Sequence, residues 1–252
     1  MYLDFYKLIS KLENKKLNKL DIEELARLSK LSSLKYTVNS KDELQNIIKY
    51  TCKIDNKANL NWIDTSKIIN MSQLFFNCNS PGDISEWDVS RVEDMSEMFR
   101  SSYFNGDISN WNVSNVKDMS GMFKDAFNFD KPLNSWNVSK VENMHGMFHG
   151  SKRFNQPLDN WNVSNVRDMA QMFCNCKFNQ DINNWDVSNV EDMRCMFMQN
   201  KYFNKPLNNW DVSNVKQFAS MFYASTFNQP IGKWNMSKAK SLSAMFKSSR
   251  FN

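Results

Sequence analysis

Residues 111–123 read WNVSNVKDMSGMF, and residues 136–148 read WNVSKVENMHGMF, 25 positions later. The eight tryptophans of the chain follow one another at intervals of 24 or 25 residues, at Trp62, Trp87, Trp111, Trp136, Trp161, Trp185, Trp210 and Trp234. A period of this length is typical of proteins that stack one supersecondary unit many times. The sequence therefore predicts a solenoid, and it assigns the tryptophans to the core of that solenoid instead of to a binding site.

Each predicted unit has apolar residues at fixed distances from its Trp. In residues 111–123, valine follows Trp at two and five positions, methionine at eight, and a Met-Phe pair at eleven and twelve. The Trp-x-Val spacing has the period of two expected of a short strand, and the Met-x-x-Met-Phe spacing is helical. Asp94 is a helix N-cap residue type, and Glu97 can complete a capping box. The sequence thus predicts an α/β repeat solenoid whose coils each hold one short parallel strand and one short helix.

Residues 1–60 lack the repeat and predict an N-terminal helical cap, ahead of about eight repeats of 24 or 25 residues over residues 61–252. Three amphipathic helices are expected in this head. Asp21 with Glu24 would cap the second helix, and Ser40 with Glu43 would cap the third.

The units W-N-V-S-N-V-K-D-M-S-G-M-F and F-N-Q-P-L-D-N-W resemble those of the BspA-like leucine-rich-repeat surface proteins. The resemblance covers residues 38–252, and its general form is W-[DN]-V-S-x-V-x-D-M-x-x-M-F. It implies leucine-rich-repeat-like coils and a role in surface or partner binding. The repeat domain of that family has no assigned activity. Because its members often carry a secretion or lipoprotein signal, the resemblance also implies a surface location.

Charge and composition limit the classes of function. The chain has 32 Lys and Arg against 27 Asp and Glu, a net charge of +5. Nucleic-acid-binding proteins usually gather basic residues on one face. The signs are mixed along the repeats, so no nucleic-acid partner is expected. The chain shows neither a signal peptide nor a membrane span, and its five cysteines follow no disulfide framework, so reduced thiols and a cytoplasmic location are favoured.

Candidates for catalytic or metal chemistry are few. His145 and His149 lack the Glu of a zincin motif, and Cys176 occupies a column of small residues, so no metal is expected. Asn-x-Ser sequences such as the one at Asn112 share their column with Asp88, which favours a hydrogen-bonding ladder over glycosylation. The sequence contains no evident nucleophile–base pair, phosphate loop or paired carboxylates. We therefore predict no catalytic residues, no cofactor and no enzyme activity.

Two surfaces are candidates for binding. Polar residues near the Trp column predict an extended recognition face made of Asn110, Asn134, Asp159, Asn160, Asn183, Asn184, Asn208 and Asn209. Apolar residues of the last unit predict an association end made of Ile231, Trp234, Met236 and Met245. The first hypothesis is a non-enzymatic scaffold that binds an unidentified protein through the face. The alternative is a structural protein that self-associates end to end through its C-terminal coil.

One column of charged residues alternates in sign over six consecutive units, at Glu93, Lys117, Glu142, Arg167, Glu191 and Lys216, before Lys240. Stacked coils would place each charge between two opposite charges. Such exposed pairs contribute only about 0–1 kcal/mol each. A slip by one repeat would oppose like charges, so the alternation is expected to favour one register. Chance alternation on an ordinary solvated surface is the other explanation.

Overall fold

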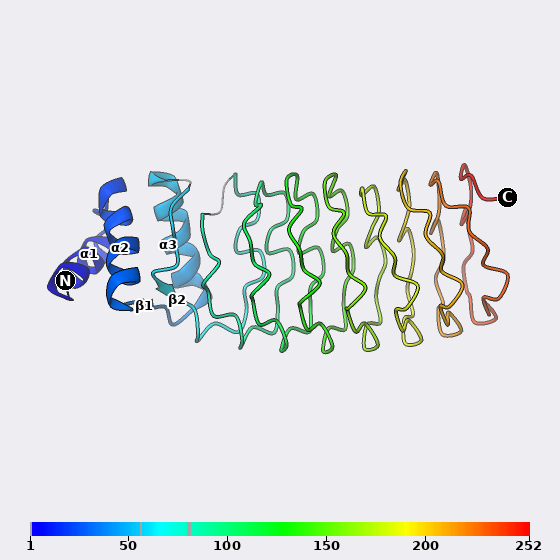
Figure 1. Cartoon of the computed structure of the whole chain (residues 1–252), viewed down its shortest axis with the longest axis horizontal. Coiled ribbons are helices and arrows are strands. Elements are labelled where there is room, and N and C mark those ends of the chain that lie inside the picture. Colours follow the sequence, from blue (N-terminus) through cyan, green and yellow to red (C-terminus); the bar gives the residue numbers. More distant parts are fainter. Residues whose placement is uncertain (1, 56, 80–81) are drawn as a thin grey trace.

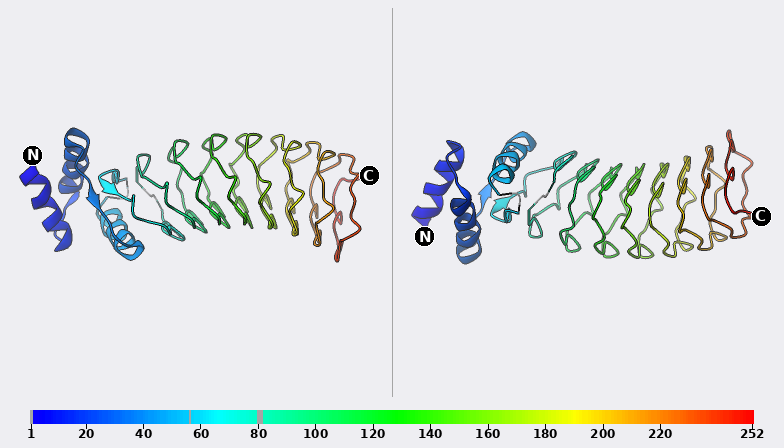
Figure 2. Two further views of the ribbon diagram at one scale, coloured as in Figure 1. Left: turned by 90° about the horizontal axis from the view of Figure 1, so that it is seen from below. Right: turned by 90° about the horizontal axis from the view of Figure 1, so that it is seen from above.

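The computed structural model describes residues 2–55, 57–79 and 82–252. Three helices come first, α1 (Tyr2–Glu13), α2 (Lys19–Ser32) and α3 (Lys41–Ile54). Strand β1 (Tyr36–Thr37) pairs in parallel with β2 (Ile63–Asp64). A row of coils follows, with the helices at one end and the C-terminus at the other (Figure 1). The same arrangement is seen from below and from above in Figure 2.

The helices of the head are capped by side chains at their N-termini. The Ser40 hydroxyl accepts a hydrogen bond from the Glu43 amide (3.1 Å), as the sequence predicted for α3. The cap of α2 is Asn18, and not Asp21 with Glu24: the Asn18 side chain accepts from the Asp21 amide, and the Asp21 carboxylate accepts from the Asn18 amide. Asp21 therefore lies in the first turn, where a carboxylate also interacts favourably with the helix dipole.

Helix α3 lies against the first coil. The Lys41 amine donates to the side chains of Asn70 (3.0 Å) and Ser72 (2.6 Å). Leu44 and Ile48, on the same side of the helix, are buried. The third helix thus covers the start of the stack of coils with both polar and apolar contacts.

Neighbouring coils are joined by a ladder of backbone hydrogen bonds in which every second amide takes part. The amides of Met95, Glu97, Phe99 and Ser101 donate to carbonyl groups of the following coil at 2.7–2.9 Å. Isolated parallel bridges continue this pairing from Asn70↔Asp94 to Gln217↔Ser241. Within this segment every second amide donates to the coil that follows, so the segment has a direction, whereas the Glu93 and Tyr103 amides on either side of it donate to the preceding coil.

The prediction of one short helix per coil is wrong. Beyond Ile54 the described residues contain no helix, and the Met-x-x-Met-Phe segment is a run of turns. The Met98 and Arg100 amides donate to carbonyls three residues earlier, at Met95 and Glu97. The remaining amides donate to the next coil, so they cannot form the bonds of an α-helix. One residue in each such turn, for example Gly121 (φ 59°), has the left-handed conformation that ends a helix.

The prediction of a strand at Trp-x-Val is also wrong. Within the described ranges, the only strands are β1 and β2. The bridges from Asn70↔Asp94 onward lie at the residue before the first Met or its replacement, and one further bridge joins Asn59 to Asp83. The Trp111 amide donates to Ile108 (3.1 Å) and the Val116 amide to Val113 (2.9 Å), so this segment also turns. Two turns that bury Trp and Val on one side produce the same period of two as a strand does.

The core of the stack consists of columns of aromatic rings. Phe99 and Phe123 of adjacent coils stack with centroids 5.5 Å apart, and Phe104 and Phe129 do so at 6.1 Å. Each Trp from Trp87 onward donates its indole N–H to a carbonyl of the preceding coil, at 2.9–3.3 Å. The repeated Trp therefore links two coils through both packing and a buried hydrogen bond.

The first coil departs from this pattern. The Ile63 amide donates to Leu60 as the Trp87 amide donates to Ile84, so Ile63 occupies the Trp position. Trp62, one residue earlier, is fully buried, but its indole N–H has no hydrogen-bond partner. Trp62 therefore packs in the core without the link that the other tryptophans make.

Candidate functional site

The predicted recognition face is a ladder of polar side chains from consecutive coils. The Asn134 side chain donates to the Asp159 carboxylate (3.0 Å) and accepts from the Asn160 amide (2.9 Å). One coil further, the Asn184 side chain donates to the Asp159 carbonyl (2.8 Å). These bonds fix the side chains in place, although most of them are solvent-exposed.

The ladder continues through the next coil but does not include every predicted residue. Asn183 accepts from the Asn209 amide (3.1 Å) and lies 3.4 Å from the Asn208 side chain. Asn110 is exposed, and no hydrogen bond within the described residues joins it to the others. The structure therefore brings together the face residues of the four coils from Asn134 to Asn209.

A polar hollow of about 500 Å³ opens in the middle of this face. It is lined by Pro157, Asp159, Gln180, Asp181, Asn183, Asn184 and Asn209. Carboxylates and amides in its wall offer both acceptors and donors to a polar partner. We did not predict Pro157, Gln180 or Asp181, although the recurring Phe-Asn-Gln sequence was a signal for the column of glutamines.

The glutamines and asparagines beside the hollow are held by the coil that precedes them. The Gln180 side chain donates to the Asn155 carbonyl (3.0 Å), and the Asn155 side chain accepts from the Asn179 amide (2.8 Å). The Asn179 side chain accepts in turn from the Asn204 amide (3.1 Å). A second polar ladder therefore fixes the segment that forms one wall of the hollow.

The alternating charge column lies on another side of the coils. Lys117 pairs with Glu93 (2.7 Å), and Glu191 pairs with Lys216 (2.5 Å) and Arg167 (3.9 Å). These hydrogen bonds and the nearby positive charge lower the pKa of Glu93 and Glu191. Since these side chains are exposed, water and salt screen the pairs, and an effect of the column on the register of the coils stays a prediction.

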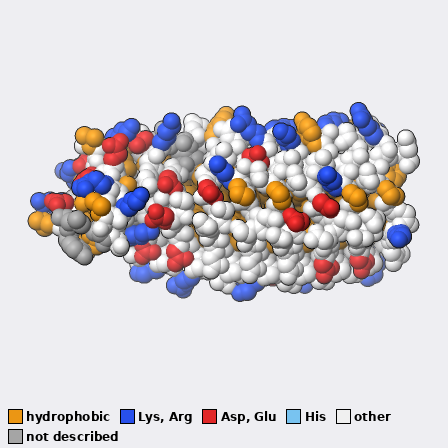
Figure 3. Space-filling view, viewed as in Figure 1, with side chains coloured by type: hydrophobic (Ala, Val, Ile, Leu, Met, Phe, Trp, Pro, Cys, Tyr) orange, Lys and Arg blue, Asp and Glu red, His pale blue; other side chains and the backbone are white. Residues whose placement is uncertain are grey.

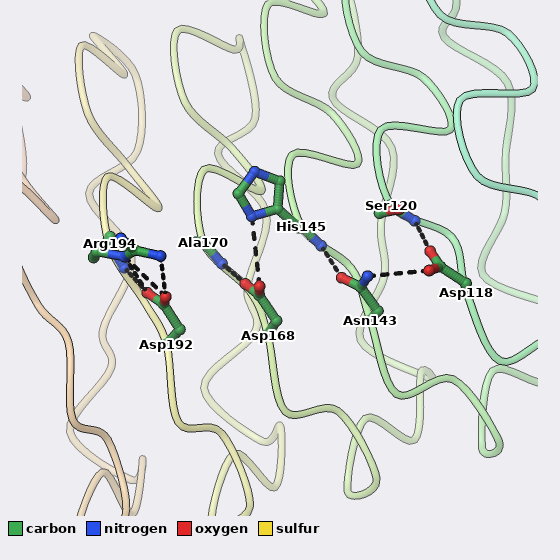
Figure 4. A network of polar contacts seen from close by, with 8 residues as sticks. All are labelled: Asp118, Ser120, Asn143, His145, Asp168, Ala170, Asp192 and Arg194. Atoms are coloured by element: carbon green, nitrogen blue, oxygen red, sulfur yellow. Dashed lines mark hydrogen bonds and ion pairs between the residues drawn. The ribbon is translucent and has the colours of Figure 1, made fainter. Parts of the chain in front are cut away.

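The Asx residues of the bridges form a column of their own (Figure 4). One oxygen of each side chain accepts an amide two residues on, as Asp118 does from Ser120 (2.7 Å). The second oxygen meets a side chain: Asn143 donates to Asp118 (3.1 Å), His145 lies 3.5 Å from Asp168, and Arg194 binds Asp192 at 2.6 Å. These carboxylates stabilise turns, so the expected capping box at Glu97 is replaced by an Asx turn.

The two histidines are expected to titrate in opposite directions from the usual pKa near 6.5. The hydrogen bond to Asp168 raises the pKa of His145, and burial lowers the pKa of His149. His145 thus adds stability that is present below its unfolded pKa and lost as pH rises through its folded pKa. His149 adds stability that is present above its unfolded pKa and lost as pH falls through its folded pKa.

An NMR titration of the imidazole protons measures this order directly. In the wild-type chain the His145 midpoint should lie above the His149 midpoint. Asp168→Asn should bring the His145 midpoint down and leave that of His149 in place. A His145 midpoint that ignores Asp168→Asn would contradict the assigned cause.

The described residues form no disulfide and no candidate metal site. All five cysteines are free thiols, and burial raises the pKa of Cys174 and of Cys176 to about 12. Within the described ranges, no three His, Cys, Asp or Glu side chains lie together in a way that could hold a metal ion. A separate hollow of about 330 Å³, which we did not predict, lies in the head and is lined in part by Leu12, Tyr36 and Ile47.

The predicted association end is less open than we expected. Ile231, Trp234 and Met245 are buried, and Met236 is half-buried. Trp234 stacks on Trp210 of the preceding coil, with centroids 6.2 Å apart. Each apolar side chain is covered by its own coil and the one before it, and the exposed large apolar side chain of this region is Leu242.

Comparison with known proteins gave one finding. The family described as "Mycoplasma protein of unknown function, DUF285" matches residues 42–160 and 154–252, which together include most of α3 and all of the coils. No curated protein and no solved structure matched the chain. In the described parts of the chain, no helix has the length and apolar character needed to cross a membrane.

Proposed function

We propose a binding role for this chain, which belongs to the Mycoplasma protein family of unknown function DUF285. It is a non-enzymatic scaffold that binds another protein through the recognition face, the polar face between Asn134 and Asn209. The resemblance of the units to BspA-like leucine-rich-repeat surface proteins supports this role. The stack of coils also supports this role. From that stack we infer a leucine-rich-repeat-like solenoid.

One observation supports the proposal above the others. The side chains around the polar hollow are joined across four coils by hydrogen bonds of 2.8–3.4 Å. A partner that binds such a face does not need to immobilise flexible side chains, so less entropy is lost on binding. The mixture of amides and carboxylates fits polar side chains and backbone groups of a partner.

The test is a comparison of three proteins in crosslinking pulldowns from cells that make the protein. Asn160→Arg with Asn209→Arg places two bulky charges on the recognition face. Asn112→Arg with Asn137→Arg places the same charges on exposed positions away from it. A protein captured by the wild type and by the control pair, but lost with the face pair, supports the proposal. Capture that ignores the face pair would contradict it.

End-to-end assembly is the alternative. Its support is the exposed Leu242, while burial of Ile231, Trp234 and Met245 weighs against an apolar contact. Light scattering at rising protein concentration tests it. Growth of the particle mass that Leu242→Lys abolishes would favour assembly, and a constant monomer mass would exclude it.

A further inference from the structure

One long edge of the stack collects most of the excess positive charge of the chain. We name it the basic edge, and it consists of the segments that follow the buried Phe of each Leu-Phe or Met-Phe pair. These segments are 76–79, 100–103, 124–128, 149–153, 174–177, 198–202, 223–226 and 247–250. They contain eight Lys and Arg but one Asp, a net charge of +7, whereas the whole chain carries +5. The rest of the molecule is therefore slightly acidic.

The backbone ladder places these segments side by side. The Ser101 amide donates to Lys124 (2.8 Å), the Asp125 amide to His149 (2.7 Å), and the Gly150 amide to Cys174 (2.9 Å). The turns form a single row along the stack, and Lys and Arg side chains follow the upper edge of the molecule with apolar side chains between them (Figure 3). The sequence analysis expected mixed signs on every side, and this edge is the exception.

The charges on this edge are nearly all available to a partner. Lys152, Arg153 and Lys177 are exposed, and across the described segments of the edge the one ion pair is that of Arg100 with Glu97. Elsewhere on the stack, Lys117, Arg167, Arg194 and Lys216 each face a carboxylate, and Lys140 and Lys238 each donate to an Asn side chain. Within the edge, Lys201 donates to the Ala224 carbonyl. Unpaired basic side chains in a row attract a polyanion or an anionic surface.

Aromatic side chains accompany the charges. Phe76, Tyr103, Phe127 and Tyr202 are 41–54% exposed, and all four belong to the basic edge. The Tyr103 and Phe127 rings lie 5.0 Å apart, and the Arg100 guanidinium lies 5.5 Å from the centre of the Phe76 ring. Exposed aromatic rings next to basic groups are typical of surfaces that meet the headgroup region of a membrane.

The shape of the edge distinguishes between anionic partners. Single-stranded nucleic acid is usually held in a positive groove where bases stack on aromatic rings. The basic edge is a row of projecting turns, and the polar hollows farther along the coils are lined by other segments. One hollow of about 370 Å³ between α3 and the first coil reaches the edge, but only at its first segment, which has no Lys or Arg. A projecting row meets a flat surface with all its side chains at once. We propose that the basic edge docks on an anionic membrane surface.

Docking in this way is compatible with the proposed function but does not depend on it. The recognition face is formed by the segments before each Trp, and the basic edge by the segments after each Met-Phe pair. A molecule lying on its basic edge keeps the recognition face open to a protein partner. Lys and Arg side chains supply the attraction to anionic headgroups, and the aromatic rings enter the headgroup layer.

The test is sedimentation with vesicles of two parts phosphatidylcholine to one part phosphatidylserine, at low salt. Each Lys or Arg near an anionic surface is worth about a fivefold change in partition, so Lys152→Ala, Arg153→Ala and Lys177→Ala together should weaken binding about a hundredfold. The control replaces Lys140, Lys233 and Lys238, which are exposed but lie outside the basic edge, and has the same net charge. The control should bind nearly as the wild type does.

Three results would overturn the proposal. The first is no binding to these vesicles at low salt, and the second is an equal loss in the edge variant and the control. The third is binding to a mixed-sequence single-stranded oligonucleotide that is tighter than binding to the vesicles and is lost in the edge variant, since this would assign the edge to nucleic acid.

The aromatic rings of the edge are tested separately. Tyr103→Ser with Phe127→Ser should also lower vesicle binding at high salt, where the charges are screened. Circular dichroism melts confirm that each variant is folded.

Discussion

Replacing Trp161 with alanine is expected to lower the free energy of unfolding by about 3–5 kcal/mol. The Trp161 side chain is buried and lies 6.4 Å from the Trp185 ring and 6.4 Å from the Phe148 ring. Its indole N–H donates to the Leu133 carbonyl at 2.9 Å. Removal leaves a cavity inside the stack and takes away one of the two hydrogen bonds of the Leu133 carbonyl, and neighbouring coils cannot close the gap because the ladder fixes their spacing. Urea unfolding followed by circular dichroism measures the loss.

A second pair of variants separates the hydrogen bond from the packing. Trp161→Phe keeps an aromatic ring but removes the indole hydrogen bond to the Leu133 carbonyl, which keeps its bond from the Trp136 amide (3.0 Å), so the loss should be about 0.5–1.5 kcal/mol. Trp62→Phe removes a buried N–H that has no partner, so it should cost clearly less. Equal losses for the two phenylalanine variants would show that the indole hydrogen bonds do not contribute to the stability of the stack.

Asn200→Ala is expected to have the second-largest effect, a loss of about 2–4 kcal/mol, because buried amides are left without acceptors. The Asn200 side chain is fully buried and accepts hydrogen bonds from the amides of Tyr202 and Phe203, both at 2.9 Å. It also donates to the Phe178 carbonyl (3.2 Å). Alanine satisfies none of these groups, and the change is measured as a shift of the urea midpoint.

Ser225→Ala is the matched control in the same column. The Ser225 hydroxyl accepts one long hydrogen bond, from the Phe227 amide at 3.3 Å. Its removal should cost less than half as much as the loss of Asn200. If both variants shifted the urea midpoint equally, side-chain volume alone would explain the effect of this column. The additional hydrogen bonds of Asn200 would then contribute nothing to the free energy of unfolding.

The repeated apolar residues made the core predictable from the sequence. Every valine, methionine and phenylalanine position around Trp111 is buried in the structure, because a side chain that recurs in each coil meets its own copy in the next. The conformation of the Met-x-x-Met-Phe segment was not predictable in the same way. A spacing of three residues matches both a helix and a turn closed over three residues. Gly121 and Gly146, with positive φ, carried the only local signal for turns.

The candidate surfaces differ in how far the sequence reveals them. The polar residues from Asn134 to Asn209 recur beside Trp, so their alignment across coils follows from the repeat. The basic edge is made of two partly filled columns: Arg100, Lys124 and Lys247 directly follow the buried Phe, and Lys152, Lys177, Lys201 and Arg250 follow it by four positions. Neither column is basic in every coil, so our sequence analysis did not single them out, and the coordinates of the turns show that the two columns lie along one edge.

The direction of the backbone ladder limits the symmetry of any assembly that extends the stack. Within the bridge segment, four amides of a coil donate forward, as those of Met95, Glu97, Phe99 and Ser101 do, while its remaining carbonyls are taken by turns. Two copies related by a two-fold axis would bring donors against donors. A chain that extends this segment must instead supply carbonyl acceptors, and in a second copy the start of the stack is covered by α3, so a different chain with an open edge of carbonyls fits better than a second copy.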